Sequence, residues 1–228
     1  MKFELIKYSV SKAEYNMSFD AKLANDSEKN GISYFRVYGW IEPSVTTGYF
    51  QHQDKSINFE YCLKNNIPVI KRPTGGKAIL HDNDFTFSIV INNNLFNSTR
   101  ITDYYKIVNT SLNSALNESG IPSELNCTKK KAGIKDPVCF NHTSDYEIEW
   151  NKKKIVGTAI RKFPSSTLIQ GNLPIKVNYK LYSDIFNIQQ NELYSSFCGL
   201  SDINNFFQSD NNINNLSDLF YKKICCAF

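Results

Sequence analysis

The sequence predicts an α+β fold: a single domain whose mixed or antiparallel sheet is flanked by helices. Strand-like and helix-like segments both recur along the 228 residues, but without the regular strand-helix-strand repeat of a parallel α/β fold. The composition, 41% hydrophobic and 21% charged, is that of a globular chain able to bury a large core. Because no internal repeat divides the chain, we expect residues 1–228 to form one domain.

The first predicted helix covers residues 12–29. Ser11 and Glu14 have the spacing of a capping box, in which each side chain satisfies the other residue's backbone N–H group. Apolar residues then follow Met17 at helical spacing, and Gly31 provides the residue type that most often ends a helix.

The remaining elements follow from alternation in strands, helical periodicity and turn residues. Strands are expected at residues 32–40, 46–50, 69–71, 85–91 and 167–173, and helices at 59–64 and 102–119. The second of these helices should bury Tyr105, Val108, Leu112 and Ala115. A hairpin is expected to turn at Asn151 and Lys152. Short helical pieces should follow Asn178, the last with Leu216, Phe220 and Ile224 on one face.

Composition and charge argue against several classes of protein. The chain has no signal peptide and no apolar run long enough to span a membrane, so we expect a cytoplasmic protein without membrane contact. Six cysteines form no Cys-x-x-Cys pair and the three histidines are too few for a dedicated metal site. The net charge of +4 is mild, and the lysine runs at 129–131 and 152–154 lack interleaved aromatic residues, so no nucleic-acid partner is expected.

The stretch KRPTGGKAILHD, Lys71 to Asp82, places a glycine pair between two strand-like runs. Gly75 and Gly76 have no Cβ, so a ligand can approach their N–H groups closely, which suits an anion or an acyl carbonyl. Arg72 is a permanent cation just before this turn, and His81 ends the strand after it. From these residues alone, a plain β-turn with a solvated arginine explains the pattern equally well.

A second cluster combines Cys139 in a loop with Lys154 in the hairpin. A lysine beside a cysteine can lower the pKa of the thiol and so generate the thiolate that nucleophilic chemistry needs. A loop cysteine that merely packs is the alternative. No Ser-His-Asp or Cys-His pairing is visible by spacing, although His81 or His142 could meet Cys139 in the folded chain.

Ordered blocks over most of the chain resemble the biotin/lipoate protein ligase and octanoyltransferase superfamily. The blocks are AEYNMSFDAKLA, FRVYGWIEPSVTTGYFQ, KRPTGGKAILHDNDFTFS, VCF and KKIVGTAIRK, and the Arg-x-x-Gly-Gly-x-Ala-x-x-His motif is the most diagnostic. The resemblance implies that residues 1–228 form a catalytic domain of this fold, with the glycine turn as one wall of an acyl-binding cleft.

The resemblance also assigns roles residue by residue. Arg72, Gly75, Gly76 and His81 inherit the cleft, and Gly157, Thr158 and Ala159 are expected to bind the substrate with them. Lys154 matches the lysine that contacts the acyl carbonyl. This chain departs from the family at Ile169-Gln170-Gly171-Asn172, where a Gln-His-Gly segment is common, so the role of that histidine is absent or displaced.

The superfamily divides by chemistry near Cys139. Lipoate ligases activate a free acid with ATP and typically carry a Gly-Arg-Asn-Asp type segment there, whereas octanoyltransferases of the cysteine-loop type carry Ala-Cys-Phe. Val138-Cys139-Phe140 therefore implies an octanoyltransferase of lipoate assembly, with Cys139 as the acyl carrier and Lys154 as the oxyanion donor. The donor would be octanoyl-acyl carrier protein, and the acceptor a lysine of a lipoyl domain or of the glycine-cleavage carrier protein.

No cofactor or metal is needed for this reaction, and a monomer is expected. The first alternative is an ATP-dependent lipoate-protein ligase without the accessory C-terminal domain, which would use ATP and Mg. The second is a protein that binds an acyl group or a lipoyl domain without turnover.

Overall fold

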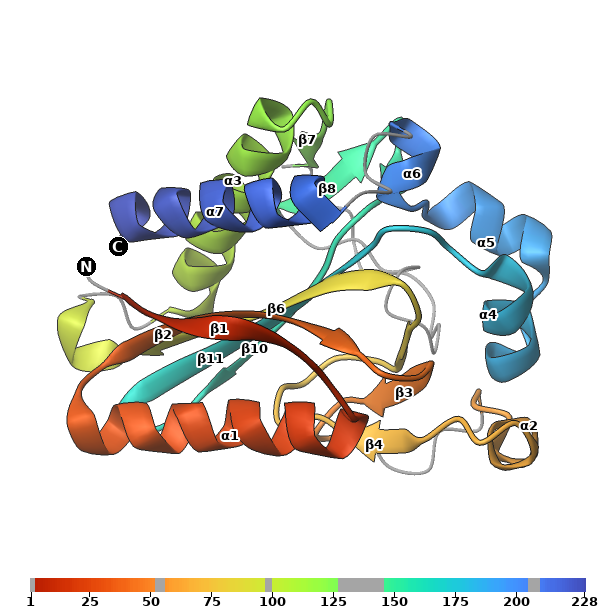
Figure 1. Ribbon diagram of the computed structural model, residues 1–228, viewed down its shortest axis with the longest axis horizontal. Coiled ribbons are helices and arrows are strands. Elements are labelled where there is room, and N and C mark those ends of the chain that lie inside the picture. Colours follow the sequence, from red (N-terminus) through yellow and green to blue (C-terminus); the bar gives the residue numbers. More distant parts are fainter. Residues whose placement is uncertain (1–2, 52–55, 97–99, 127–145, 205–209) are drawn as a thin grey trace.

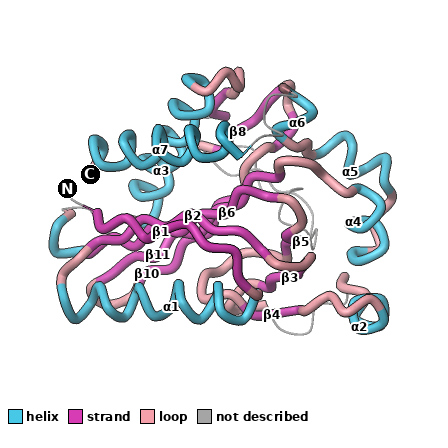
Figure 2. Tube along the Cα trace, in the orientation of Figure 1, coloured by secondary structure: helices cyan, strands magenta, loops and turns pink. Residues whose placement is uncertain are grey.

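In the computed structural model, residues 3–51, 56–96, 100–126, 146–204 and 210–228 are described. A five-stranded mixed sheet crosses the centre of the molecule, and two small three-stranded sheets lie beside it (Figures 1 and 2). The large sheet has the order β1 (Phe3–Ser11), β2 (Ser33–Trp40), β6 (Asp84–Asn92), β11 (Ser166–Pro174) and β10 (Gly157–Lys162). Only the β1–β2 pair is parallel in this sheet, so the predicted α+β class is confirmed.

The two small sheets carry the segments around the glycine turn and the hairpin. One has the order β4 (Val69–Lys71), β3 (Ser44–Thr47) and β5 (Ile79–His81), and the other β7 (Glu124–Asn126), β8 (Glu147–Trp150) and β9 (Lys153–Lys154). The chain between β4 and β5 is the glycine turn. Asn151 and Lys152 have φ angles of 49° and 64°, so the predicted hairpin turn is confirmed as one with two left-handed residues.

Helices cover both faces of the large sheet. Helix α1 (Ala13–Asn30) packs on one face, and α3 (Ile101–Glu118) with α7 (Asp210–Ala227) covers the other (Figure 1). The shorter helices are η1 (Asn93–Leu95), α2 (Phe59–Lys64), α4 (Tyr179–Phe186), α5 (Gln190–Ser196) and α6 (Leu200–Ile203). None of the helices in the described ranges is long and apolar enough to cross a membrane.

The hydrophobic interior is divided into separate clusters. The largest lies between the large sheet and the α3–α7 face, and it includes the predicted residues Leu216, Phe220 and Ile224. A second cluster joins β3 and β5 to α2, α4 and α5 through residues such as Val45, Leu80 and Phe186. The glycine turn therefore belongs to a small sheet whose core is distinct from that of the large sheet.

Three local predictions need correction. Ser11 does not cap α1, because it still belongs to β1 and pairs with Trp40. The N-cap residue is Lys12, whose side chain makes no capping hydrogen bond. Strand β1 was not predicted at all. In α3 the buried tyrosine is Tyr104, which shares a face of the helix with Val108, and not Tyr105 as predicted.

The strand predicted at residues 46–50 begins earlier, at Ser44, and ends at Thr47, where the chain turns toward Thr74.

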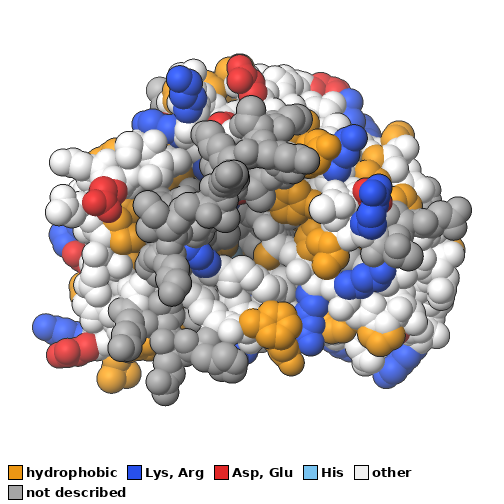
Figure 3. All heavy atoms as spheres, turned by 180° about the vertical axis from the view of Figure 1, so that it is seen from behind, with side chains coloured by type: hydrophobic (Ala, Val, Ile, Leu, Met, Phe, Trp, Pro, Cys, Tyr) orange, Lys and Arg blue, Asp and Glu red, His pale blue; other side chains and the backbone are white. Residues whose placement is uncertain are grey.

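Lys and Arg side chains are scattered over the face seen in Figure 3 rather than gathered into one patch.

Candidate active site

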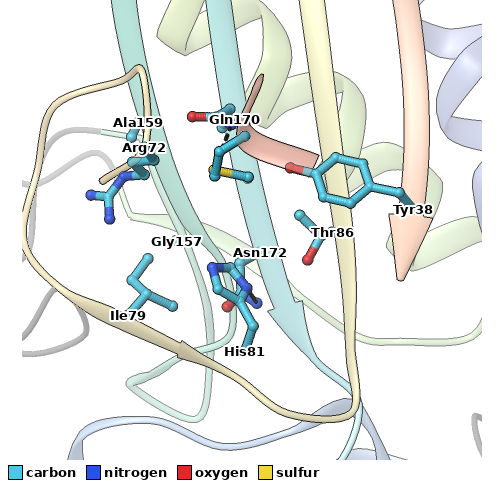
Figure 4. A pocket seen from close by; sticks show the side chains of 11 residues that line it. Tyr38, Arg72, Ile79, His81, Thr86, Gly157, Ala159, Gln170 and Asn172 are labelled. Atoms are coloured by element: carbon cyan, nitrogen blue, oxygen red, sulfur yellow. Dashed lines mark hydrogen bonds between the residues drawn. The ribbon is translucent and has the colours of Figure 1, made fainter. Parts of the chain in front are cut away.

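A narrow cavity lies between the glycine turn and the strands β10 and β11 (Figure 4). Its volume of about 20 Å³ has room for one water molecule. Four of the predicted site residues line it, namely Arg72, His81, Gly157 and Ala159. The fold thus brings together two motifs that are more than seventy residues apart in the sequence.

Arg72 holds the glycine turn in shape. Its guanidinium donates to the carbonyl of Gly75 through Nε (3.1 Å) and Nη2 (2.6 Å), and to the carbonyl of Lys77 through Nη2 (2.8 Å). Nη1 donates to the carbonyl of Thr46 at 3.1 Å. The side chain is buried, so its charge acts on the cavity from a fixed position instead of being solvated.

The two glycines of the turn have different requirements. Gly76 has a φ of +89°, and a Cβ built there would lie 2.7 Å from Arg72 Nη2, so this position needs glycine. A Cβ at Gly75 would meet no described heavy atom within 4 Å. The space beside Gly75 is therefore open for a ligand to approach the backbone.

This contrast separates a folding role from a binding role. Gly76→Ala should lower stability by about 1–2 kcal/mol, because a residue with a Cβ is strained at positive φ. Gly75→Ala should keep the melting temperature of the wild type but slow the octanoyl transfer that the sequence resemblance implies, because the added methyl group occupies the open space. Thermal melts and transfer rates of both variants test this, and equal behaviour of the two would contradict it.

His81 is a fixed wall residue. Arg72 Nη1 lies 3.4 Å from Thr46 Oγ1, so the Thr46 hydroxyl accepts there and can donate to His81 Nε2 at 3.0 Å. His81 Nδ1–H then donates to Asp84 Oδ2 at 2.7 Å. The ring stacks on Trp40 with centroids 3.9 Å apart. Because both ring nitrogens are engaged, neither is free to activate a cysteine thiol in this arrangement.

The segment of β11 that departs from the Gln-His-Gly pattern contains one glycine fixed by packing and one residue that lines the cavity. A Cβ at Gly171 would lie 2.1 Å from the ring of Phe87 on the neighbouring strand, so only glycine fits there. Gly171 is thus required by packing, and the residue before it is Gln170. Gln170 lines the cavity, accepts from the Thr74 hydroxyl at 2.6 Å and donates to Asp20 Oδ2 at 2.7 Å.

Asp20 of α1 is the centre of a buried polar network that the sequence analysis missed. Its carboxylate accepts from Arg36 Nη1 at 2.7 Å, from the Ser88 hydroxyl at 2.8 Å and from the Tyr38 hydroxyl at 2.8 Å. Burial, followed by the charge of Asp20, raises the pKa of Tyr38 well above its usual value, so this hydroxyl stays a donor. The sequence does contain a sign of this network, namely Arg36 within an apolar strand, because a buried charge requires a partner.

Lys154 is held in a buried ion pair. Its Nζ donates to Glu147 Oε1 at 2.7 Å, and both side chains are buried. Its backbone carbonyl accepts from the N–H of Cys198 at 3.3 Å. Lys154 ends β9, three residues before the cavity residue Gly157 that begins β10, and its side chain does not line the cavity.

The remaining predicted residues lie elsewhere. Thr158 donates from its hydroxyl to Asn109 Oδ1 on α3 at 3.0 Å, and it does not line the cavity as its neighbours do. Cys139 and His142 lie outside the described residues.

The chain matches the model of the lipoyl protein ligase A/B catalytic domain over residues 12–224. It belongs to this family.

Relatives within the family include octanoyltransferases named LipM. That of Exiguobacterium sp. is 29% identical over 81% of this chain and 69% of its own length, and that of Carboxydothermus hydrogenoformans is 34% identical over 75% and 63%. The chain thus spans about two thirds of the length of these relatives. The names of these relatives agree with the predicted octanoyltransferase of lipoate assembly, an acyltransferase.

Solved structures of the family share the fold. A lipoate-protein ligase A bound with ATP has a TM-score of 0.80 and 19% identity, covering 99% of this chain and 86% of that one. A bi-partite lipoate protein ligase from Thermoplasma acidophilum has a TM-score of 0.78 and 17% identity, covering 97% and 82%. The predicted fold is therefore confirmed, and the match over residues 12–224 confirms the predicted family.

Two of the cysteines in the described part of this family member are unsuited to nucleophilic attack. Burial raises the pKa of the Cys198 thiol to about 11 and also raises that of Cys62, so both stay protonated at neutral pH. Among the described residues, no three His, Cys, Asp or Glu side chains gather in a way that could hold a metal ion.

Proposed function

We propose that this chain transfers an octanoyl group from acyl carrier protein, through a thioester on Cys139, to a lysine of a lipoyl domain or of the glycine-cleavage carrier protein. The observation that carries the proposal is the narrow cavity where Arg72, His81, Gly157 and Ala159 meet, in a family member similar to octanoyltransferases. The proposal includes a cytoplasmic, monomeric enzyme with one catalytic domain and no cofactor.

In the first step the Cys139 thiolate attacks the carbonyl carbon of the octanoyl thioester. The C–S bond to the carrier breaks, the carrier thiolate leaves and takes a proton, and a new thioester forms on Cys139. Lys154 donates a hydrogen bond to the carbonyl oxygen as negative charge develops there. Glu147 orients the Lys154 ammonium at the end of β9 through their hydrogen bond.

In the second step the neutral ε-amine of the acceptor lysine attacks the acyl-enzyme. An amide bond forms, the nitrogen loses a proton, and Cys139 leaves as thiolate, ready for the next cycle. No ATP is needed because a thioester is more reactive than the amide it becomes. The octanoyl chain needs more room than the cavity of about 20 Å³ offers, so the lining side chains move apart to admit it and then position it for both attacks.

Intact mass spectrometry tests the proposal directly. The purified protein is mixed with octanoyl-acyl carrier protein without ATP, for the wild type and for Cys139→Ala. We expect an octanoyl adduct, labile to hydroxylamine, on the wild type only, and no transfer to a lipoyl domain by the variant.

Two results would contradict the proposal. Full transfer activity in Cys139→Ser would show that the thiol is not the acyl carrier. An absent adduct, with lipoyl-domain labelling only after ATP and free acid are added, would identify the ATP-dependent ligase instead.

A further inference from the structure

A groove of about 430 Å³ adjoins the narrow cavity. It lies beside α1 and β4, and its lining includes Ser18, Ala21 and Phe163. Two residues line both spaces, Met17 and Arg72. The boundary between the closed cavity and the open groove therefore includes these two side chains.

The two boundary residues differ in how firmly they are held. The Arg72 guanidinium is fixed by hydrogen bonds to the carbonyls of Thr46, Gly75 and Lys77. Met17 is 5% exposed, and the polar contact of its sulfur is with Gln170 Nε2 at 3.6 Å. A thioether is a weak acceptor on a flexible, unbranched side chain. Met17 is thus the part of the boundary that can yield or be removed.

The strand register gives the direction of the acyl tail. Gly157 pairs with Asn172, and Ala159, two residues further from Lys154, pairs with Gln170. An acyl group whose carbonyl lies at the Lys154 end therefore extends along β10 and β11 toward Gln170. Gln170 is the residue that touches Met17. The tail of the acyl group would end against the Met17 side chain.

We propose that Met17 sets the acyl-chain length of this enzyme by separating the acyl cavity from the groove beside α1. The inference rests on the proposed function, because it takes the tail direction from the role of Lys154. Removing the Met17 side chain joins the cavity to the groove, so chains longer than eight carbons gain room to extend.

The experiment compares acyl-enzyme formation from octanoyl- and dodecanoyl-acyl carrier protein by intact mass. Met17→Ala and Met17→Val should raise the ratio of dodecanoyl to octanoyl rate by about tenfold or more, the size of effect that a few methylenes have in an apolar pocket. Met17→Leu, which conserves volume, should keep the wild-type ratio.

Two matched controls separate chain length from general damage. Leu23→Ala removes another buried side chain of α1, which belongs to a hydrophobic cluster away from the cavity. Ser18→Ala changes a residue that lines the groove but not the cavity. Neither control should change the ratio. An unchanged ratio in both Met17→Ala and Met17→Val would overturn the inference.

A binding measurement distinguishes this inference from the transferase proposal. Octanoic and dodecanoic acids are titrated calorimetrically into Cys139→Ala, with and without Met17→Ala. Tighter dodecanoic acid binding with Met17→Ala supports the inference even if the wild type never forms an octanoyl adduct, which would refute the transferase alone. Equal preference in both proteins would refute the length role of Met17.

Discussion

Lys154→Met should lower the rate of octanoyl transfer by about a hundredfold to a thousandfold, the usual cost of losing one oxyanion donor. It should also destabilise the fold by about 3–5 kcal/mol, because the buried Glu147 carboxylate loses the ammonium 2.7 Å away. Urea unfolding and initial rates of acyl-enzyme formation measure the two effects separately. Lys153→Met, one residue earlier and partly exposed, is the matched control that should show neither effect.

The double variant Lys154→Met/Glu147→Gln separates stability from chemistry. Glutamine leaves no buried charge, so most of the lost stability should return while octanoyl transfer stays slow. Recovery of transfer in the double variant would mean that Lys154 serves the fold and not the reaction. A Lys154→Met protein with full stability would show instead that the ion pair contributes nothing to folding.

Asp20→Ala should be among the most destabilising single changes in the described part of the chain, by about 3–5 kcal/mol. The substitution leaves Arg36 as a buried charge and removes the acceptor of Tyr38 and Gln170. Asp26→Ala is the matched control, because this second aspartate of α1 pairs with an exposed lysine, Lys22, and should change little.

Asp20→Asn distinguishes the charge of Asp20 from its shape. The amide keeps a side-chain oxygen near Arg36 but cannot accept on both sides, so stability should fall and Gln170 should lose its anchor. Because Gln170 accepts from Thr74, the glycine turn should shift and the rate of octanoyl transfer should fall as well. Unfolding curves and transfer rates together check this, and wild-type values for both would contradict it.

Locally determined features were predictable from the sequence, and features that depend on distant neighbours were not. Gly31 ends α1 with a φ of 75°, and Asn151 with Lys152 makes the hairpin turn, because these conformations are dictated by residue type within a few positions. Strand β1 escaped prediction because it is an edge strand with mostly exposed side chains, and its pairing partner β2 follows only after α1.

The candidate site shows the same division. Arg72 and His81 came from a motif match, and the fold brings both to the cavity with Gly157 and Ala159. The sequence could not show that Gln170 links Thr74 to Asp20 at the cavity, because these partners lie far from it in the chain. The place of Met17 between two cavities likewise depends on how α1 lies across the sheet.

The cavity lies at the boundary between two separately packed hydrophobic clusters. His81 ends β5 of the small sheet, whose core includes Leu80, and Arg72 directly follows β4 of the same sheet, while Gln170 belongs to the large sheet. Hydrogen bonds such as that from Thr74 to Gln170 cross this boundary, but among the described residues no hydrophobic cluster spans it. An acyl group bound there would contact residues of both sheets. Its binding energy would therefore stabilise the packing of the two sheets against each other rather than the core of either one.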